Sequence, residues 1–449
     1  MIDIRLALVI DLSAVALCFI GLLRWGNISF MHPAVPYFVF HLWCTTQRLL
    51  QFVLGSPPSV LFARQPLQEG EIVRASLLFD LTLFLMTLAW ILAAWLDRRR
   101  NGPLPAPGRE APPNLSGKYL LGVVAVILPL GIVGRLQAAA RAPSMLVHQA
   151  HQRGPVGWDQ SFATTMIQDW MGLALMALIY WYGFQKRLVL LFAVYAAAIV
   201  SLGDSRFLLV LPLIFIAYVY LTRHGRRWPD ARIAAALLLG AVLWLPGRAV
   251  GRAVMSGQNV AAVVHTGLHV WGTATSRSDD PDTQFLDMAA ATLALVDQKG
   301  KFYYGETITP LFFIWIPRPL WPDKPEHNEY MYDLSTPRRD LAHMTMTTSL
   351  MGDSYVNFGY VGIVLVPFLF AFLLGCAYFA AFRSHYYSIG RFTYLVVACS
   401  LIQPYRDGLY SFFTFNLFIM MPFVVLGLLH YVFPTVRRTP CPVVTDPPG

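Results

Sequence analysis

Long apolar runs separated by short polar stretches recur along the whole chain. A run of roughly 17–25 mostly apolar residues is long enough to cross a lipid bilayer as a helix. The pattern predicts about eleven such helices and therefore an all-α polytopic membrane protein. We place them at residues 6–23, 36–54, 75–96, 119–136, 167–184, 188–202, 207–221, 233–245, 361–382, 392–402 and 412–433.

Basic residues between the runs predict the orientation of these helices. They gather in every second loop, at residues 98–118, 186–187, 223–232, 383–391 and 437–438. Cytoplasmic loops carry an excess of Lys and Arg, so we expect the C-terminus in the cytoplasm and the N-terminus outside. The alternate loops are then periplasmic, at residues 135–166, 203–206, 247–360 and 403–411.

The composition agrees with a membrane protein and excludes several other classes. The chain is 56% hydrophobic and 13% charged, against about 25% charged in soluble domains. The net charge is +9, but the basic residues lie between the apolar runs, which argues against nucleic-acid binding. The five Cys have no metal-binding spacing, and no nucleotide-binding or zinc-protease motif occurs. We expect one integral membrane domain over residues 1–449, with a disordered cytoplasmic tail at 439–449.

The long periplasmic loop at residues 247–360 is the expected place for chemistry. Residues 284–296 have helical apolar spacing, which fits equally a helix lying on the membrane and a packed surface helix. Residues 309–317 are too few to span a bilayer and predict an interfacial or re-entrant segment that brings Arg318 to membrane depth. The loop thus carries short interfacial helices.

Several basic residues lie on the predicted outer side, against the usual distribution of charge. Arg206 and Arg406 lie in short outer loops, in the sequences GDSR and PYRDG. Local ion pairs with Asp204 and Asp407 would explain them, and so would an anionic ligand. Arg is suited to phosphate because its planar guanidinium donates two hydrogen bonds at once and keeps its charge. The further candidate substrate-binding residues of the outer side are Arg318, Lys324, Arg338 and Arg339.

A second set of polar residues precedes the run at residues 361–382. Asp353 is the acidic residue closest to that run, and Asn357 follows it by about one helical turn. Asp353 or His343 could accept a proton from a sugar hydroxyl and are the catalytic candidates. Asn357 and Asp407 complete the candidate substrate-binding residues, whereas a polar surface is the simpler explanation for a single His.

The stretches IPRPLWPDKP (316–325) and TSLMGDSYVNFGYVG (348–362) resemble the signature loop of the Wzy polysaccharide polymerases, which make O-antigen and related bacterial surface glycans. GDSRFLLVLPLIF (203–215) and YRDGLYSFFTFNLF (405–418) resemble the Arg-bearing span ends of that family in the same order. The resemblance implies a metal-independent glycosyltransferase without a cofactor. Arg206, Arg318 and Arg406 would bind the pyrophosphate of the donor and Lys324 would assist. Asp353 stands where many members have an acidic residue.

The implied substrates are oligosaccharide repeat units linked to undecaprenyl pyrophosphate, joined at the periplasmic face of the bacterial inner membrane. A chain-length regulator and a flippase of the same pathway are the implied partners besides the lipid bilayer. An O-antigen ligase that transfers glycan to the lipid A core is the first alternative. A polysaccharide transporter without chemistry is the second. Transporters commonly contain internal repeats and helices broken by Gly or Pro at the membrane midplane; the sequence shows neither pattern, and its charges gather at one membrane face.

Overall fold

A computed structural model describes residues 3–55, 67–104, 121–133, 158–201, 207–235, 285–313, 316, 320–321, 349–384 and 388–432. Every element in these ranges is a helix. They are α1 (Ile4–Gly21), η1 (Leu22–Gly26), α2 (Ala34–His41), η2 (Leu42–Thr46), α3 (Gln47–Val53), α4 (Glu69–Asn101), the helix Leu121–Val133, α6 (Trp158–Tyr182), α7 (Lys186–Ser201), α8 (Phe207–Arg223), α11 (Phe285–Lys299), η4 (Thr309–Phe313), α13 (Ser349–Arg383), α14 (Ile389–Cys399) and α15 (Ile402–Val432).

Four of these helices are long and apolar enough to cross a membrane: Ile4–Gly26, Glu69–Asn101, Ser349–Arg383 and Ile402–Val424. Shorter apolar helices include Trp170–Tyr182, Val210–Arg223 and Ile389–Cys399. A described helix overlaps each predicted span, although for residues 233–245 the overlap is confined to 233–235, since the rest lie outside the described ranges. The described part of the chain is therefore all-helical, with the long apolar helices of a membrane protein, and the number of eleven spans stays a prediction.

Two predicted boundaries are wrong, both next to polar motifs. Helix α13 begins at Ser349 and so includes residues 349–360, which we had assigned to the long loop. Residues 403–411 are helical within α15 instead of forming a periplasmic loop. In both cases the helix continues beyond the apolar run because a break at a glycine changes its direction without ending it.

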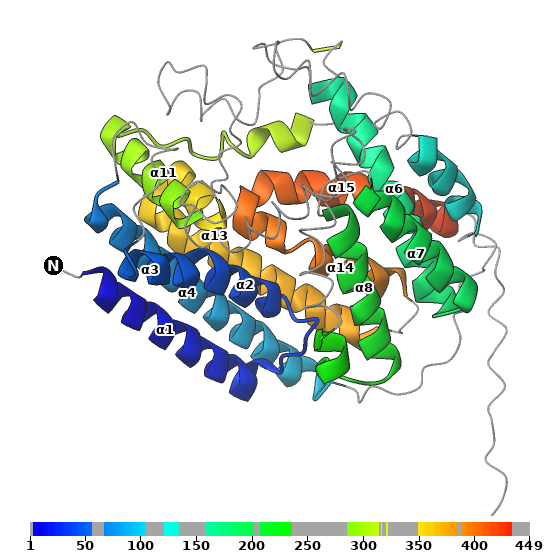
Figure 1. Ribbon diagram of the computed structural model, residues 1–449, viewed down its shortest axis with the longest axis horizontal. Coiled ribbons are helices and arrows are strands. Elements are labelled where there is room, and N and C mark those ends of the chain that lie inside the picture. Colours follow the sequence, from blue (N-terminus) through cyan, green and yellow to red (C-terminus); the bar gives the residue numbers. More distant parts are fainter. Residues whose placement is uncertain are drawn as a thin grey trace, which may run out of the picture.

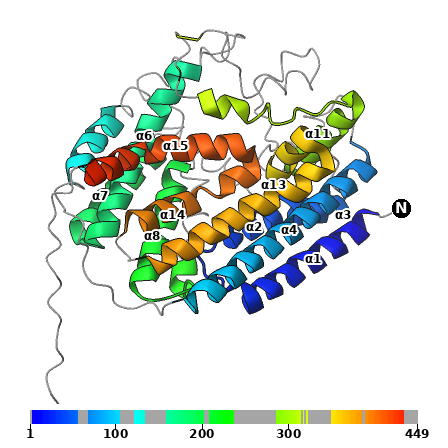
Figure 2. The same ribbon diagram turned by 180° about the vertical axis from the view of Figure 1, so that it is seen from behind.

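Helices α1, α4 and α13 lie side by side along one half of the molecule (Figures 1 and 2). Gly375 of α13 faces Ala93 of α4 so closely that an added Cβ would come within 2.9 Å of the alanine Cβ. Small residues of this kind allow membrane helices to approach each other. Arg383 donates to Asp97 at 2.8 Å at one end of the pair, and Arg74 donates to Tyr355 at 2.7 Å at the other. The two helices are therefore parallel.

The N-terminal helices form a hairpin against α4. The backbone N–H of Ile4 donates to Glu69 Oε1 at 3.1 Å, so α1 and α4 begin at the same end of the molecule. Between them the chain returns through α2, η2 and α3, which follow one another without a gap. The connecting turn η2 is a π-helix, a rare geometry that is frequent at functional sites.

Helices α6, α7, α8 and α14 form the other half of the molecule (Figure 1). Aromatic side chains fill its centre, where Phe392 of α14 packs against Trp181 of α6 with ring centroids 5.0 Å apart. Helix α15 joins the two halves, since it packs against both α13 and α6. Trp170 Nε1 of α6 donates to the carbonyl of Phe418 in α15 at 3.0 Å.

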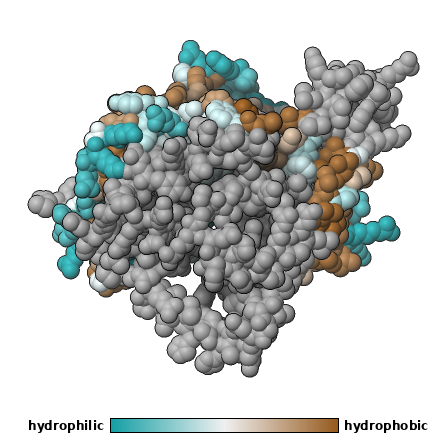
Figure 3. Space-filling view, turned by 90° about the horizontal axis from the view of Figure 1, so that it is seen from above, coloured by the Kyte–Doolittle hydropathy of each residue, from teal (hydrophilic) through white to brown (hydrophobic). Residues whose placement is uncertain are grey.

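The expected helix at residues 284–296 is confirmed as α11, but it does not lie on the surface. Residues Phe285 to Leu293 are buried against α4 and α13. The exposed apolar side chains lie elsewhere, for example Leu17 at 70% and Leu373 at 65% of their maximum. Figure 3 shows apolar residues gathered on one flank, with hydrophilic residues beside them. This surface fits contact with lipid.

Candidate functional site

Two long helices, α13 and α15, are each broken at a glycine. Gly359 has φ 60° and ψ −143°, and Gly408 has φ 83° and ψ 179°. Positive φ values are accessible to glycine at little cost, which explains the residue type at both positions. Both breaks lie in the polar ends of the helices, beside the residues that the sequence identified.

The break in α13 frees backbone carbonyls that another segment satisfies. The N–H groups of Tyr303 and Tyr304 donate to the carbonyls of Val356 and Asn357 at 3.1 and 3.0 Å. Unpaired backbone groups are costly inside a membrane protein, so non-helical backbone there needs such partners. The segment that follows α11 therefore stabilises the broken end of α13.

Asn357 holds this segment with its side chain. Its amide donates to the carbonyl of Asp353 and to Thr307 Oγ1, both at 2.8 Å, and its Oδ1 accepts the N–H of Gly305 at 2.8 Å. The helical turn predicted between Asp353 and Asn357 is confirmed by the first of these bonds. Because both amide hydrogens donate to protein atoms, Asn357 positions the backbone of this segment.

Asp353 brings α13 into contact with the break in α15. Its side chain is buried, and Oδ2 accepts the backbone N–H of Leu409 at 3.1 Å. A Cβ at Gly408 would lie 2.3 Å from the same oxygen. Only a glycine at position 408 therefore leaves room for the Asp353 carboxylate. We call this contact the α13–α15 junction and define it by Asp353, Arg406, Asp407, Gly408 and Leu409.

Arg406 and Asp407 are the partly exposed members of the junction. Arg406 Nε lies 3.1 Å from Asp407 Oδ1, with side-chain exposures of 30% and 20%. This is the local ion pair that the sequence left open. The guanidinium carbon also lies 5.6 Å from the centroid of the Phe285 ring, over a buried residue of α11. A cation held over an aromatic ring beside a break is accessible to an anionic ligand.

A buried ion pair lies two residues away from Phe285 along α11. Arg48 of α3 donates to both oxygens of Asp287, at 3.2 and 2.6 Å, and its guanidinium lies 4.3 Å from the Phe52 ring centroid. Arg48 is 2% and Asp287 0% exposed. This two-point pairing fixes the position of α11 and therefore of Phe285 beneath Arg406.

A second charged group joins α11 to the ends of α4 and α13. Asp297 accepts hydrogen bonds from Tyr355, at 2.5 Å, and from Arg74. Partial burial would raise the pKa of Asp297, but these two hydrogen bonds and the charge of Arg74 hold it below its ordinary value. Asp297 is therefore a carboxylate at neutral pH.

The junction unites three of the residues predicted from the sequence, Asp353, Arg406 and Asp407, and Asn357 lies one helical turn from Asp353. The others lie outside the described residues, and their predicted roles rest on the sequence. They are Arg206, Arg318, Lys324, Arg338, Arg339 and His343.

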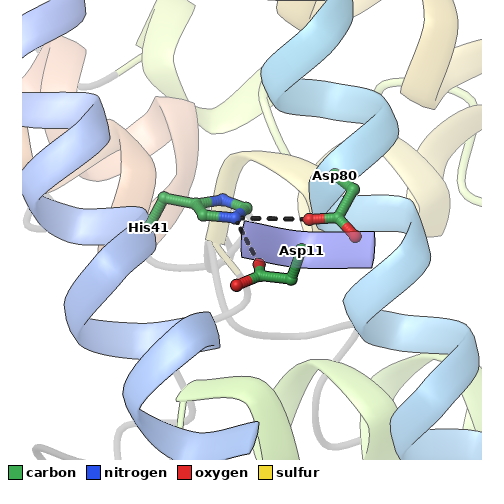
Figure 4. Close-up of side chains that lie close together, drawn as sticks. All are labelled: Asp11, His41 and Asp80. Atoms are coloured by element: carbon green, nitrogen blue, oxygen red, sulfur yellow. Dashed lines mark hydrogen bonds and ion pairs between the residues drawn. The ribbon is translucent and has the colours of Figure 1, made fainter. Parts of the chain in front are cut away.

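A second polar cluster was missed by the sequence analysis. Asp11 of α1, His41 of α2 and Asp80 of α4 meet in the interior of the N-terminal helices (Figure 4). His41 Nε2 lies 2.8 Å from Asp11 Oδ1 and 3.4 Å from Asp80 Oδ1. The sequence did contain a signal for this cluster. Each of the first three apolar runs contains one of its ionisable residues, and such residues are rare and usually functional inside membranes. We call Asp11, His41 and Asp80 the N-terminal cluster.

The fold and the junction define a helical membrane protein with a charged site at the breaks of two packed helices. Comparison with family models, with curated proteins and with solved structures finds no match to this chain. The site and the sequence motifs that meet there are therefore the basis for inferring a function.

Proposed function

We propose that this protein is a polymerase that joins undecaprenyl-pyrophosphate-linked oligosaccharide repeat units into a surface polysaccharide. The observation that carries the proposal is the hydrogen bond between Asp353 and the N–H of Leu409. It joins residues 348–362 and 405–418, two of the stretches that resemble the polymerase family. Motifs that are far apart in the chain thus contribute to one place.

The chemistry requires a cation at the leaving group. The acceptor sugar hydroxyl attacks the anomeric carbon of the donor, the bond from that carbon to the pyrophosphate oxygen breaks, and negative charge develops on the lipid pyrophosphate. A preorganised guanidinium stabilises that charge in the transition state. Arg406, which is 30% exposed beside the helix break, is suited to this role. Arg206 and Arg318 would complete the pyrophosphate site and Lys324 would assist, while Arg338 and Arg339 remain candidate substrate-binding residues.

The role of Asp353 differs from the one expected from the sequence. Its side chain is 1% exposed and accepts a backbone hydrogen bond, so a sugar hydroxyl does not reach it in this arrangement. We assign Asp353 as a positioning residue that holds the break of α15 and, through it, Arg406. His343 is then the candidate base that accepts the hydroxyl proton.

The distribution of charge supports a periplasmic site. Arg98, Arg99 and Arg100 end α4 at the same end of the molecule as Arg383, whereas the junction lies at the opposite end of α13, near its start. If the basic end faces the cytoplasm, as charge asymmetry favours, the junction faces the outside. The N-terminus would also lie outside, because Ile4 contacts Glu69.

The broken helices give specific support to a second candidate, a polysaccharide transporter. Helices α13 and α15 are both interrupted at glycine, although these breaks lie in the polar ends of the helices, whereas the sequence argument against a transporter concerned breaks at the membrane midplane. Transporters bind substrates at such interruptions. An O-antigen ligase would use the same donor chemistry, and the stretch at residues 316–325 favours the polymerase over it.

A gel of surface polysaccharide from a strain lacking the gene separates the three functions. We expect loss of the ladder of long chains with a retained band of one repeat unit, restored by the intact gene but not by Arg406→Ala. The matched control is Arg226→Ala, which removes an exposed Arg paired with Asp230 four residues later and should restore the ladder. Loss of all glycan from the lipopolysaccharide would indicate a ligase or a transporter instead.

Purified protein then decides whether chemistry occurs. Incubation with lipid-linked repeat units should yield longer lipid-linked glycans, and Arg406→Ala should reduce the rate by about 100-fold or more, as for loss of a transition-state donor. Absence of elongation by folded protein with authentic substrate would contradict the polymerase and leave the transporter.

A further inference from the structure

We propose that Asp11, His41 and Asp80 bind a divalent transition-metal ion that crosslinks α1, α2 and α4 inside the membrane domain. The inference is independent of the polymerase proposal, because the N-terminal cluster lies on other helices than the α13–α15 junction. It assigns a role to three buried ionisable side chains that the proposed reaction does not use.

The geometry of the cluster fits a metal site. His41 Nε2, one oxygen of Asp11 and one oxygen of Asp80 lie within 4.8 Å of one another. Ligands bound at about 2.1 Å from one ion lie roughly 3–3.5 Å apart. The distances of 2.8 and 3.4 Å from His41 Nε2 to the two carboxylates are close to this range. Figure 4 shows the three side chains, each from a different helix, pointing toward one another.

The hydrogen bonding of the cluster is incomplete. Asp11 Oδ2 accepts the hydroxyl of Thr46 at 2.6 Å, and Asp11 Oδ1 contacts His41. Asp80 is 7% exposed and forms a long ion pair with His41 Nε2 at 3.4 Å, but neither of its oxygens accepts a regular hydrogen bond from a described residue, and His41 Nδ1 has no hydrogen-bond partner there either. A buried carboxylate without donors is strongly disfavoured, so Asp80 points to a cation among these side chains.

The charges identify the kind of cation. Two carboxylates and one neutral imidazole carry two negative charges, and the two positive charges of a divalent ion balance them. A protonated His41 would leave one negative charge buried. One imidazole nitrogen with two carboxylate oxygens suits first-row ions such as Zn²⁺ or Mn²⁺.

The surrounding structure holds the ligands in place. The π-helical turn η2 follows His41 directly and brings the Thr46 hydroxyl to Asp11. Outer hydrogen bonds of this kind orient metal ligands. One turn before His41, Tyr37 packs on Tyr405 of α15, with ring centroids 4.5 Å apart. A metal ion would thus stabilise the surface of α2 on which α15 rests, next to Arg406.

The test uses full-length protein purified in detergent, stripped with EDTA and then titrated separately with Zn²⁺ and Mn²⁺. We expect about one ion retained per chain after desalting, measured by elemental analysis, and a rise in the thermal unfolding temperature. Asp80→Asn and His41→Gln should abolish both effects. Asp97→Asn, which changes a carboxylate of the same helix that is paired with Arg383, should retain them.

Two results would overturn the proposal. The first is a wild-type protein that holds neither ion above the level of Asp80→Asn. The second is an Asp80→Asn variant that binds as tightly as wild type. If no ion is bound and Asp80→Asn leaves the unfolding temperature unchanged, Asp80 is a neutral acid in a proton-sharing cluster instead. Asp80→Glu, which keeps a ligand oxygen, controls for misfolding and should retain binding that is weaker by about 10-fold.

Discussion

Asp80 and Asp353 are both buried carboxylates in long apolar helices, but their surroundings differ. Asp353 accepts a hydrogen bond from the backbone N–H of Leu409 at 3.1 Å. This N–H is available as a donor because α15 is broken at Gly408. Asp80 faces helices whose backbones are continuous, and its closest polar contact is His41 at 3.4 Å. A broken helix supplies backbone donors to a buried charge, whereas a continuous helix cannot. The charge of the N-terminal cluster has to be balanced by side chains or by an ion.

The largest effect is expected where the two regions are joined, at the ion pair of Arg48 and Asp287. Asp287→Asn leaves the buried Arg48 charge without its partner and should lower the free energy of unfolding by about 3–5 kcal/mol. Thermal or denaturant unfolding in detergent measures the loss. The double variant Arg48→Met, Asp287→Leu removes both charges and should recover most of it. A double variant as unstable as Asp287→Asn would show that the pair stabilises the fold beyond neutralising its own two charges.

The next largest effect is expected from Gly408→Ala, which acts on the junction alone. The new Cβ would lie 2.3 Å from Asp353 Oδ2 and the backbone has φ 83°, so we expect a loss of about 3 kcal/mol together with loss of polymer formation. Gly300→Ala is the matched control, because Gly300 has φ 61° and open space around it. It should cost only about 1 kcal/mol. Equal losses would mean that backbone strain, and not contact with Asp353, explains Gly408.

Comparing Asp353→Asn with Asp80→Asn tests the contrast directly. In metal-free protein, Asp353→Asn weakens a hydrogen bond to a charged acceptor and should cost about 1–2 kcal/mol. Asp80→Asn removes a charge that has no hydrogen-bond donor and should be neutral or stabilising under the same conditions. Parallel unfolding curves of the two variants and the wild type provide the measurement. Equal destabilisation would remove the distinction between the two sites.

The smallest effect is expected at Asp297, which joins α11 to α4 near the junction. Its side chain is 41% exposed, so Asp297→Asn should cost only about 0.5 kcal/mol at neutral pH. Because the folded pKa lies below the ordinary value near 4, this contribution is complete above that value and disappears as the pH falls through the folded pKa. The difference in unfolding temperature between wild type and Asp297→Asn should therefore vanish at acid pH. A difference that grows on acidification would contradict the lowered pKa.

The helices were predictable to different degrees. Helices α1, α4 and α13 follow from apolar runs long enough to span a bilayer, and α11 follows from helical spacing. The start of α13 and residues 403–411 were wrongly assigned to loops, because polar residues interrupt the apolar pattern there. At the first of these places a glycine break frees backbone carbonyls, and the N–H groups of Tyr303 and Tyr304 satisfy them; apolar periodicity does not report such bonds.

Asp353, Arg406 and Asp407 of the junction were identified from the sequence, but the contact that Asp353 makes was not. Asp353 and Arg406 were singled out because charges at the ends of apolar runs are costly without a purpose. That Asp353 is buried and binds backbone depends on a contact between residues 56 positions apart. Asn357 was likewise expected to bind substrate, and only its three hydrogen bonds show that it holds the segment around Gly305.

Local sequence patterns were sufficient to predict a helical, apolar protein whose charges gather at the ends of the apolar runs. The reason is that bilayer thickness sets the length of each run, and the cost of unpaired backbone groups makes each run helical, independently of the other runs. The tertiary structure decided which charges meet. Asp11, His41 and Asp80 come from three runs, and Asp353 and Leu409 from two helices, so their contacts depend on the packing and rotation of whole helices. Those contacts arise from close packing between segments, which no local pattern encodes.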